Sequence, residues 1–455
     1  MTFVAINPAT GVELRRFDTI STADAKEVLA AADKAHHEWK KTSLAHRAEL
    51  LRRLAGQLRA KASELAISMA EEMGKPLAAG RAEAEKCAWA CDHYADHGAE
   101  FLASETVESD AARSYVAYEP LGVVLAIMPW NFPFWQAIRC AAPALMAGNA
   151  VLLKHAPNVP GCALAIESLF REAGFPSGLF TNLFVTEKQI ATLIRHRLVR
   201  AVTLTGSVRA GKAVAKQAGA KIKKTVLELG GSDPYVVFED ADPAAAATAC
   251  VTSRLINAGQ SCIAAKRLIV VDAVRRQFES LVVGRMQAAR VGDPFDPTTD
   301  VGPQARADLR DAVHRQVTES IAAGASCLVG GTLPDGPGFF YPPTVLTNVR
   351  KGMPAYDEEV FGPVAAIIPV RDRRQALRVA NDTAFGLGAA VFTGDVAEGE
   401  RIAREELQAG SCFVNAFVRS DPRLPFGGVR ESGYGRELGR AGILEFVNVK
   451  TVYVG

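Results

Sequence analysis

The sequence predicts an α/β fold made of two strand–helix sets and one small separate β element. The chain has 455 residues, of which 49% are hydrophobic, and such a length is typical of about three domains or two large ones. Strands and helices are predicted to alternate over residues 122–218 and again over residues 233–370. This alternation indicates right-handed crossovers and a mostly parallel sheet in each set.

The N-terminal part is helical in pattern. Residues 1–11 are typical of a strand and a turn, and Ala, Leu, Lys, Arg and Glu then dominate to about Ala103. Ser21 with Asp24 three residues later resembles a capping box at a helix start. Residues 106–118 are polar, with β-branched and aromatic side chains, and predict an exposed hairpin.

The first alternating set begins with a buried strand over residues 122–128. The expected elements after it are helix 133–146, strand 150–154, helix 160–173, strand 181–185, helix 188–195, strand 198–205 and helix 208–218. We expect these strands to form one parallel sheet.

The second set begins with a strand over residues 233–238, after Gly230 and Gly231, which are expected to allow a sharp change of direction. Its other expected elements are helix 243–257, strand 267–271, helices 274–287 and 305–323, and strands near 326–329 and 365–370. The tail 443–454 returns to strand character. The predicted divisions are residues 1–104 with 118–230, residues 231–430, and residues 105–117 with 440–455.

Composition excludes several function classes. Lys and Arg number 52 against 50 Asp and Glu, for a net charge of +2, which argues against nucleic acid as a partner because such a surface needs a cationic excess. Residues 120–138 are uncharged over the length of a membrane span, but three prolines and Asn131 interrupt them, so no membrane is expected. The eight irregularly spaced cysteines and the absence of a leader pattern predict reduced thiols and a cytoplasmic protein.

The segment from Gly206 to Ala213 nearly satisfies a phosphate-loop pattern. It follows a predicted strand and opens a helix, and Gly206, Gly211 and Lys212 match. Ala213 has no hydroxyl to place on Mg²⁺, which disfavours a nucleoside triphosphatase. A dinucleotide pyrophosphate on the helix N-terminus is the favoured interpretation, and a purely structural turn is the alternative.

Two pairs on the predicted helix before Ala103 have metal-ligand spacing. His93 and His97 are four residues apart, as are Cys87 and Cys91. Cys91 and His93 point to opposite sides of a helix, so we expect no metal site.

Cys262 and Glu228 form a candidate pair for covalent catalysis. Cys262 ends a small-residue turn before an apolar strand, where a thiolate can attack a carbonyl. Glu228 places a carboxylate at an apolar strand end, and burial would raise its pKa toward the range of a general base. An inert buried thiol is the alternative when Cys262 is considered alone.

Asn131 lies between aromatic residues and two prolines. A rigid amide donor of this kind is suited to stabilising an oxyanion, although a simple helix N-cap is an alternative. Asn131, Trp135 and Arg139 recur at four-residue spacing and are expected to share one helix face. Arg139 would lie roughly 12 Å along the axis from Asn131, where a guanidinium could bind a substrate carboxylate, with Ser420 as a second donor. A pair between Arg139 and a surface acid is the alternative.

Together these segments resemble the aldehyde dehydrogenase superfamily over essentially the whole chain. The matching segments are Pro-Trp-Asn-Phe-Pro at 129–133, the segment at Lys154, Thr-Gly-Ser at 205–207, Leu-Glu-Leu-Gly-Gly at 227–231, Gly-Gln-Ser-Cys at 259–262, Glu-Val-Phe-Gly-Pro at 359–363 and Pro-Phe-Gly-Gly at 425–428. More narrowly, residues 153–159 and 420–423 resemble the short succinate semialdehyde dehydrogenases. The resemblance implies a Rossmann-like cofactor domain (1–104 and 118–230), an α/β catalytic domain (231–430) and a small β oligomerisation element (105–117 and 440–455).

The resemblance also implies residue roles. Cys262 would attack the aldehyde, Asn131 and the Cys262 backbone N–H would hold the oxyanion, and Glu228 would deprotonate the water that hydrolyses the thioester. The implied cofactor residues are Trp130, Lys154, Pro157, Gly206, Ser207, Gly211, Leu229, Glu359 and Phe361. The implied substrate residues are Trp135, Arg139, Ser261 and Ser420.

The cofactor is expected to be NAD or NADP. Many NAD-specific members carry a Glu where this chain has Pro157, so no carboxylate there excludes a 2′-phosphate, and no donor attracts one. The expected substrate is succinate semialdehyde or a similar carboxylated aldehyde, with another short aldehyde as the alternative and a nucleotide hydrolase as the rival class. The two β-patterned segments near residues 106–118 and 445–454 are expected to pair between subunits of a homodimer or dimer of dimers.

Overall fold

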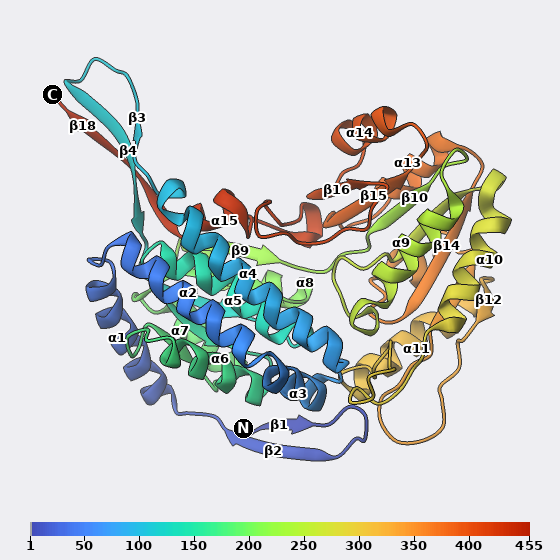
Figure 1. The fold of residues 1–455 in the computed structure, drawn as a ribbon, viewed down its shortest axis with the longest axis horizontal. Helices are drawn as coiled ribbons and strands as arrows, with labels where there is room; N and C mark the ends of the chain where they lie inside the picture. The colour runs from blue at the N-terminus through green and yellow to red at the C-terminus, as the bar shows by residue number, and fades with distance from the viewer. Residues whose placement is uncertain (1) are drawn as a thin grey trace.

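The computed structural model describes residues 2–455 and is organised around two large sheets (Figure 1). The first sheet has six strands in the order β17-β9-β8-β5-β6-β7. Its strands are β5 (Val123–Ile127), β6 (Ala150–Lys154), β7 (Phe180–Asn182), β8 (Val199–Thr205), β9 (Lys224–Glu228) and β17 (Gly433–Tyr434). All pairs are parallel except β17 with β9.

Eight helices belong to the same half of the molecule as the first sheet (Figure 1). They are α1 (Thr22–Trp39), α2 (Leu44–Ala60), α3 (Ala62–Met73), α4 (Leu77–Phe101), α5 (Pro133–Met146), α6 (Pro160–Glu172), α7 (Glu187–Arg195) and α8 (Val208–Gly219). The capping box predicted at Ser21 and Asp24 is present at the start of α1. Strand β5 is almost wholly buried and helix α5 is buried along its whole length, so most of the uncharged segment 120–138 is part of the core.

The second sheet has seven strands in the order β12-β13-β14-β11-β10-β15-β16. They are β10 (Pro234–Val237), β11 (Arg267–Val271), β12 (Ser326–Val329), β13 (Thr344–Thr347), β14 (Val364–Val370), β15 (Gly388–Phe392) and β16 (Ser411–Val414). Val236 and Ile269 belong to one core cluster, while Tyr235 and Leu268 belong to another. Alternate residues of these strands therefore pack on opposite faces, as in a sheet covered on both sides.

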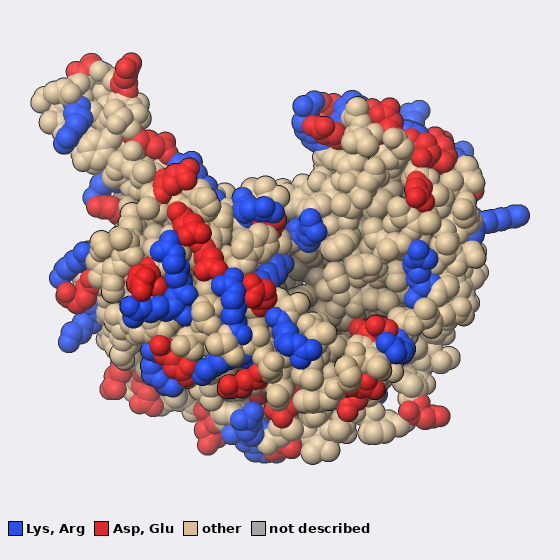
Figure 2. Space-filling model, viewed as in Figure 1, with Lys and Arg blue, Asp and Glu red and all other residues tan. Residues whose placement is uncertain are grey.

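The helices of this second half are mostly short. They are α9 (Pro243–Leu255), η1 (Ile256–Gly259), α10 (Asp272–Ala288), α11 (Ala307–Ala322), α12 (Pro354–Asp357), α13 (Arg373–Asn381) and α14 (Val396–Glu405). The chain then passes through η2 (Arg430–Ser432) and β17 back to the first half, where α15 (Gly439–Leu444) packs against α4 and α5. Acidic and basic side chains are interspersed over the face shown in Figure 2, in keeping with the small net charge.

A three-stranded sheet projects from the body as an arm (Figure 1). It consists of β3 (Glu105–Thr106), β4 (Arg113–Pro120) and the C-terminal β18 (Val447–Val454), in the order β18-β4-β3. The two β-patterned segments predicted from the sequence thus pair with each other within one chain. A separate hairpin joins β1 (Thr2–Ile6) to β2 (Glu13–Asp18).

Several predicted elements differ from the structure. The strand expected at 181–185 is the shorter β7, and the helix expected to reach residue 257 ends at Leu255 because Asn257 and Ala258 adopt left-handed conformations. Strands β13, β15 and β16 were not predicted. Neither Gly230 nor Gly231 has a left-handed φ, so the conformational freedom of glycine that was expected for a sharp turn is not used here. Side chains there would instead collide with the Glu359 carboxylate and the Cys262 carbonyl.

Candidate active site

Cys262 follows a strained turn at the end of α9. Asn257, Ala258 and Gly259 have successive φ values of 55°, 55° and 76°, and this region costs a residue such as Ala about 1 kcal/mol or more. Arg254 Nη2 donates to the Gly259 carbonyl at 2.5 Å, and Gln304 Nε2 donates to the Ala258 carbonyl at 3.1 Å. These bonds hold the turn in a conformation that places Cys262 at a cavity wall.

The Cys262 side chain is a partly exposed free thiol. Burial raises its pKa to about 12, while the nearby charges of Lys266 and Arg139 lower it. Lys266 also fixes the backbone here, because its ammonium donates to the carbonyls of Ser261 at 2.9 Å and Cys262 at 2.7 Å. The resting group is therefore a thiol that must lose a proton before it can act as a nucleophile.

Asn131 lies against the Cys262 turn. Its Nδ2 donates to the Gln260 carbonyl at 3.0 Å, and Asn257 Nδ2 donates to the Asn131 carbonyl at 2.7 Å. Asn131 does not cap α5. Glu83 does so instead, because its Oε1 accepts from the backbone N–H groups of Phe134 and Trp135 at 2.9 and 3.0 Å. The Asn131 amide is thus held rigidly against Gln260, which stands two residues before Cys262.

Glu228 ends strand β9 and is 2% exposed. Neither carboxylate oxygen has a hydrogen-bond partner among the described residues. Burial raises the pKa of Glu228 well above its ordinary value, the nearby Glu437 raises it further, and Arg139 opposes the shift. A carboxyl group with these surroundings is suited to accept a proton near neutral pH. Gly427 leaves room for the Glu228 side chain, since a Cβ at residue 427 would lie 2.7 Å from Glu228 Oε1.

Glu437 is a site residue that the sequence analysis missed. It forms an ion pair with Arg139, and the two side chains are only 3% and 2% exposed. Arg139 Nη2 also donates to Thr205 Oγ1 at 3.3 Å. Arg139 therefore pairs with a buried acid rather than with the surface acid that was considered, and its charge is already balanced. The sequence signal was weak, because Glu437 stands in a run rich in Gly and charge that predicts a loop.

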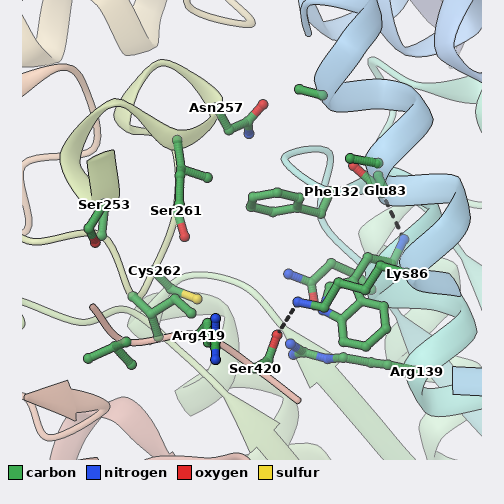
Figure 3. Close-up of a pocket in the computed structure, with 18 of the residues that line it drawn as sticks. Glu83, Lys86, Phe132, Arg139, Ser253, Asn257, Ser261, Cys262, Arg419 and Ser420 are labelled. Carbon is green, nitrogen blue, oxygen red and sulfur yellow. Dashed lines mark hydrogen bonds between the residues drawn. The ribbon is translucent and has the colours of Figure 1, made fainter. Parts of the chain in front are cut away.

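A cavity of about 250 Å³ brings the predicted substrate residues together. Cys262 and Ser261 line one side, and Arg139 from α5 lines the other (Figure 3). Trp135 from α5 also lines this cavity. Ser420 also lines it, as does Lys86 from α4, which the sequence analysis missed although it stands three residues after the buried Glu83. Asn131 and Glu228 are not among the residues that line this cavity.

A second cavity of about 330 Å³ lies between α7 and α8. Lys154 lines it together with Leu204, Arg209 and Val214, and Glu187 adds one acid. Burial lowers the pKa of Lys154, and the charge of Glu187 partly opposes this. Pro157 is exposed and does not line the cavity.

The predicted phosphate-binding residues lie at the start of α8. Ser207 is the N-cap, and its hydroxyl accepts from the Ala210 N–H at 3.3 Å. Gly206 donates its N–H to the Glu228 carbonyl at 2.9 Å. Gly211 is packed against Leu229, since a Cβ there would lie 2.6 Å from that side chain. These contacts hold the N-terminus of α8 directly against the end of β9.

Glu359 and Phe361 both lie near Lys266, the residue that binds the Cys262 backbone. Glu359 Oε1 accepts from the Gly231 N–H at 3.1 Å and lies 3.4 Å from Lys266 Nζ. The Phe361 ring meets the Trp130 ring edge-on, with centroids 5.9 Å apart. Lys266 therefore links the carboxylate of Glu359, one of the predicted cofactor residues, to the backbone of the nucleophile.

The other sequence candidates occupy structural positions. His93 and His97 form a ring contact with centroids 4.8 Å apart, and Cys87 and Cys91 are buried. Within residues 2–455, no group of three or more His, Cys, Asp or Glu side chains is arranged to hold a metal ion. None of the helices in that range is long and apolar enough to cross a bilayer.

The sequence matches the aldehyde dehydrogenase family over residues 1–452, and the chain belongs to this family. A probable succinate-semialdehyde dehydrogenase [NADP(+)] of Synechocystis sp. is 48% identical over 454 residues, covering all of both chains. The succinate semialdehyde dehydrogenase [NAD(P)+] Sad of Escherichia coli is 46% identical over 450 residues, or 99% of this chain and 97% of that protein.

A solved structure has the same fold. The succinic semialdehyde dehydrogenase of Streptococcus pyogenes, in complex with NADP+ as the cofactor, superimposes with a TM-score of 0.97 at 38% identity and covers 99% of each chain. The predicted superfamily resemblance and fold class are confirmed, and family membership removes the nucleotide hydrolase considered from the phosphate-loop pattern.

Proposed function

We propose that this protein oxidises succinate semialdehyde to succinate with NADP+ or NAD+. The observation that carries the proposal is the cavity in which the Cys262 thiol faces a polar, cationic wall formed by Lys86, Arg139 and Ser420. Relatives at 46–48% identity over the full chain are named for this substrate. An aldehyde with a distal carboxylate fits this cavity, because its aldehyde carbon can react with the Cys262 thiol and its carboxylate can bind to the cationic wall.

The reaction begins when the Cys262 thiol gives up its proton to water and the thiolate adds to the aldehyde carbon, which gives the oxyanion of a thiohemiacetal. The Asn131 amide and the Cys262 backbone N–H are the proposed donors to its oxyanion, and fixed donors of this kind stabilise developing charge strongly. When bound, the nicotinamide cofactor supplies the hydride acceptor. Cys262 then carries the acyl group as a thioester.

Glu228 acts in the second half of the reaction. Its carboxylate takes a proton from the water that attacks the thioester carbon. The carbon–sulfur bond breaks, the acid leaves, and the thiol of Cys262 is restored. Glu228 has no hydrogen bond that would have to break before it accepts this proton.

The chain has residues that fit the cofactor. The cavity between α7 and α8 offers apolar walls for an adenine and two cations, Lys154 and Arg209. Ser207 lies at the α8 N-terminus, where backbone N–H groups favour a phosphate. Glu359 and Phe361, with Trp130, are the proposed residues around the nicotinamide riboside. Pro157 places no carboxylate against a 2′-phosphate, which supports use of NADP+.

The direct test is an aldehyde panel with each cofactor. Succinate semialdehyde, butanal and a bulky aromatic aldehyde are supplied with NADP+ or NAD+, and reduced cofactor is followed by absorbance. The proposal predicts the highest kcat/KM for succinate semialdehyde. Comparable values for butanal would favour the alternative of a dehydrogenase for another short aldehyde.

We also propose that the arm completes a sheet between subunits of a homodimer or dimer of dimers. Strand β18 is an edge strand that exposes Val449, Tyr453 and Val454, and an apolar edge of this kind is normally covered. The eight cysteines are all unpaired, which supports a reducing, cytoplasmic location.

A further inference from the structure

Lys86 is one of the cations that line the candidate substrate cavity. It lies on α4, and its ammonium donates to Ser420 Oγ at 2.7 Å and lies 4.4 Å from the centroid of the Trp135 ring (Figure 3). The side chain is partly buried and lines the same cavity as Cys262.

The charge of Lys86 is not balanced by an ion pair within the described residues. The two carboxylates whose charges act on Lys86 are already engaged. Glu83 is paired with Lys75 and accepts from the N-terminus of α5, and Asp421 is paired with Arg423 at 2.7 Å. Withdrawing an ammonium from water without a counter-anion is costly, so this arrangement favours an anion supplied by a ligand.

Arg139 lines the same cavity, but its charge is balanced. Its guanidinium is ion-paired with Glu437, donates to Thr205 and lies over the Phe426 ring with 5.0 Å to the centroid. A substrate carboxylate near Arg139 would therefore compete with Glu437. Lys86 has no such competitor and has Ser420 as a second donor beside it.

We propose that Lys86 is the residue that selects carboxylated aldehydes, by forming the ion pair with the distal carboxylate while Ser420 donates a hydrogen bond to it. This inference rests on the proposed function and names the group that determines its substrate class. When the substrate binds, its carboxylate supplies the counter-anion that the Lys86 ammonium lacks in the free protein.

Lys86 is expected to lose its proton within the pH range in which the activity of the protein can be measured. Burial, together with the charge of Arg139 on α5, lowers its pKa to about 8, although Cys87, Glu83 and Asp421 oppose the shift. Arg419 also lines the cavity, but it is exposed and lies in solvent, where an ion pair contributes little. Loss of the proton from Lys86 should weaken the binding of a carboxylate and leave an uncharged aldehyde unaffected.

The test compares Lys86→Gln with the wild-type protein on succinate semialdehyde and butanal. Lys86→Gln is expected to lower kcat/KM for succinate semialdehyde by about 10–100-fold, mainly through KM, as for loss of a hydrogen bond to a charged group. The value for butanal should change by less than about 3-fold. Lys86→Arg should restore part of the preference. Arg81→Gln, an exposed cation on the same helix, is the matched control and should change neither aldehyde.

A pH series separates this role from a merely structural one. In the wild type, KM for succinate semialdehyde should rise above about pH 8, KM for butanal should not, and Lys86→Gln should remove the difference. Equal losses on both aldehydes, or an unchanged preference in Lys86→Gln with a lost preference in Arg419→Gln, would overturn the assignment. A wild type without any preference for succinate semialdehyde would instead contradict the proposed function.

Discussion

Glu437 and Arg139 form a buried ion pair, and this pair lies next to the catalytic candidate Glu228. The charge of Glu437 raises the pKa of Glu228, and the charge of Arg139 lowers it. Arg139 also lowers the pKa of the Cys262 thiol. One ion pair therefore acts on both proposed catalytic groups, which changes what a substitution of Arg139 should do.

Replacing Arg139 with Ala should lower the stability of the protein and its activity with every aldehyde, rather than its activity with carboxylated aldehydes alone. The change leaves Glu437 buried without its partner, and breaking such a pair costs about 3–5 kcal/mol of unfolding free energy. We expect losses of activity with both succinate semialdehyde and butanal. Chemical denaturation together with kinetics on the two aldehydes checks this. Unchanged stability with a loss confined to succinate semialdehyde would restore Arg139 as the carboxylate-binding residue.

Cys262→Ala should abolish aldehyde oxidation, because it removes the atom that carries the acyl group. The cofactor residues lie on α8 and near Glu359, so binding of NADP+ should persist within about 3-fold of the wild type. Isothermal titration with NADP+ and a sensitive rate assay provide the two readings. Residual turnover above about 1% of the wild type would refute the assignment of the nucleophile.

Glu228→Gln should slow hydrolysis of the thioester and leave its formation intact. A burst of reduced cofactor, close to one per site, should precede a steady state slower by about 100-fold or more. Stopped-flow absorbance measures both phases. If the burst disappears together with the steady state, Glu228 is also the group that deprotonates Cys262.

The raised pKa of Glu228 has a consequence for stability. The unfolded chain releases this proton near pH ~4.3, but the folded protein retains it to higher pH, so Glu228 lowers the stability as the pH rises above that value. Glu228→Gln should therefore increase the free energy of unfolding at about pH 8 and leave it nearly unchanged near about pH 3. Denaturant titrations at the two pH values measure this. Glu100→Gln, an exposed change on α4, should have no effect at about pH 8.

The arm should control assembly. Val449→Lys with Tyr453→Lys places charges on the exposed edge strand β18, which disfavours pairing with a second sheet. Light scattering should show a dimer or tetramer for the wild type and a smaller species for the variant. A wild-type monomer at micromolar concentration would contradict the proposed assembly.

The sequence was most informative where a function depends on a short segment. Cys262, Asn131 and Glu228 each belong to a local motif, and the alternation of strands and helices predicted both sheets. Strand β15 was missed because Gly388, Ala389 and Ala390 have low strand propensity, and tertiary packing determines its structure.

Relations between distant segments could not be predicted. Lys86 and Ser420 are 334 residues apart, and Glu437 reaches Arg139 only after the chain returns from the second sheet to the first. Gly230 and Gly231 show the same limit: their small size is required by the close approach of Glu359 and Cys262, which no local pattern contains.

The proposed reaction requires that succinate semialdehyde becomes covalently bound to Cys262 as a thioester. Intact-protein mass spectrometry of Glu228→Gln, quenched after mixing with succinate semialdehyde and NADP+, tests it directly. We expect a mass increase of one succinyl group that peptide mapping places on Cys262 and that is absent from the double variant with Cys262→Ala. An unmodified protein that has nevertheless formed reduced cofactor, or a succinyl group on another residue, would contradict it.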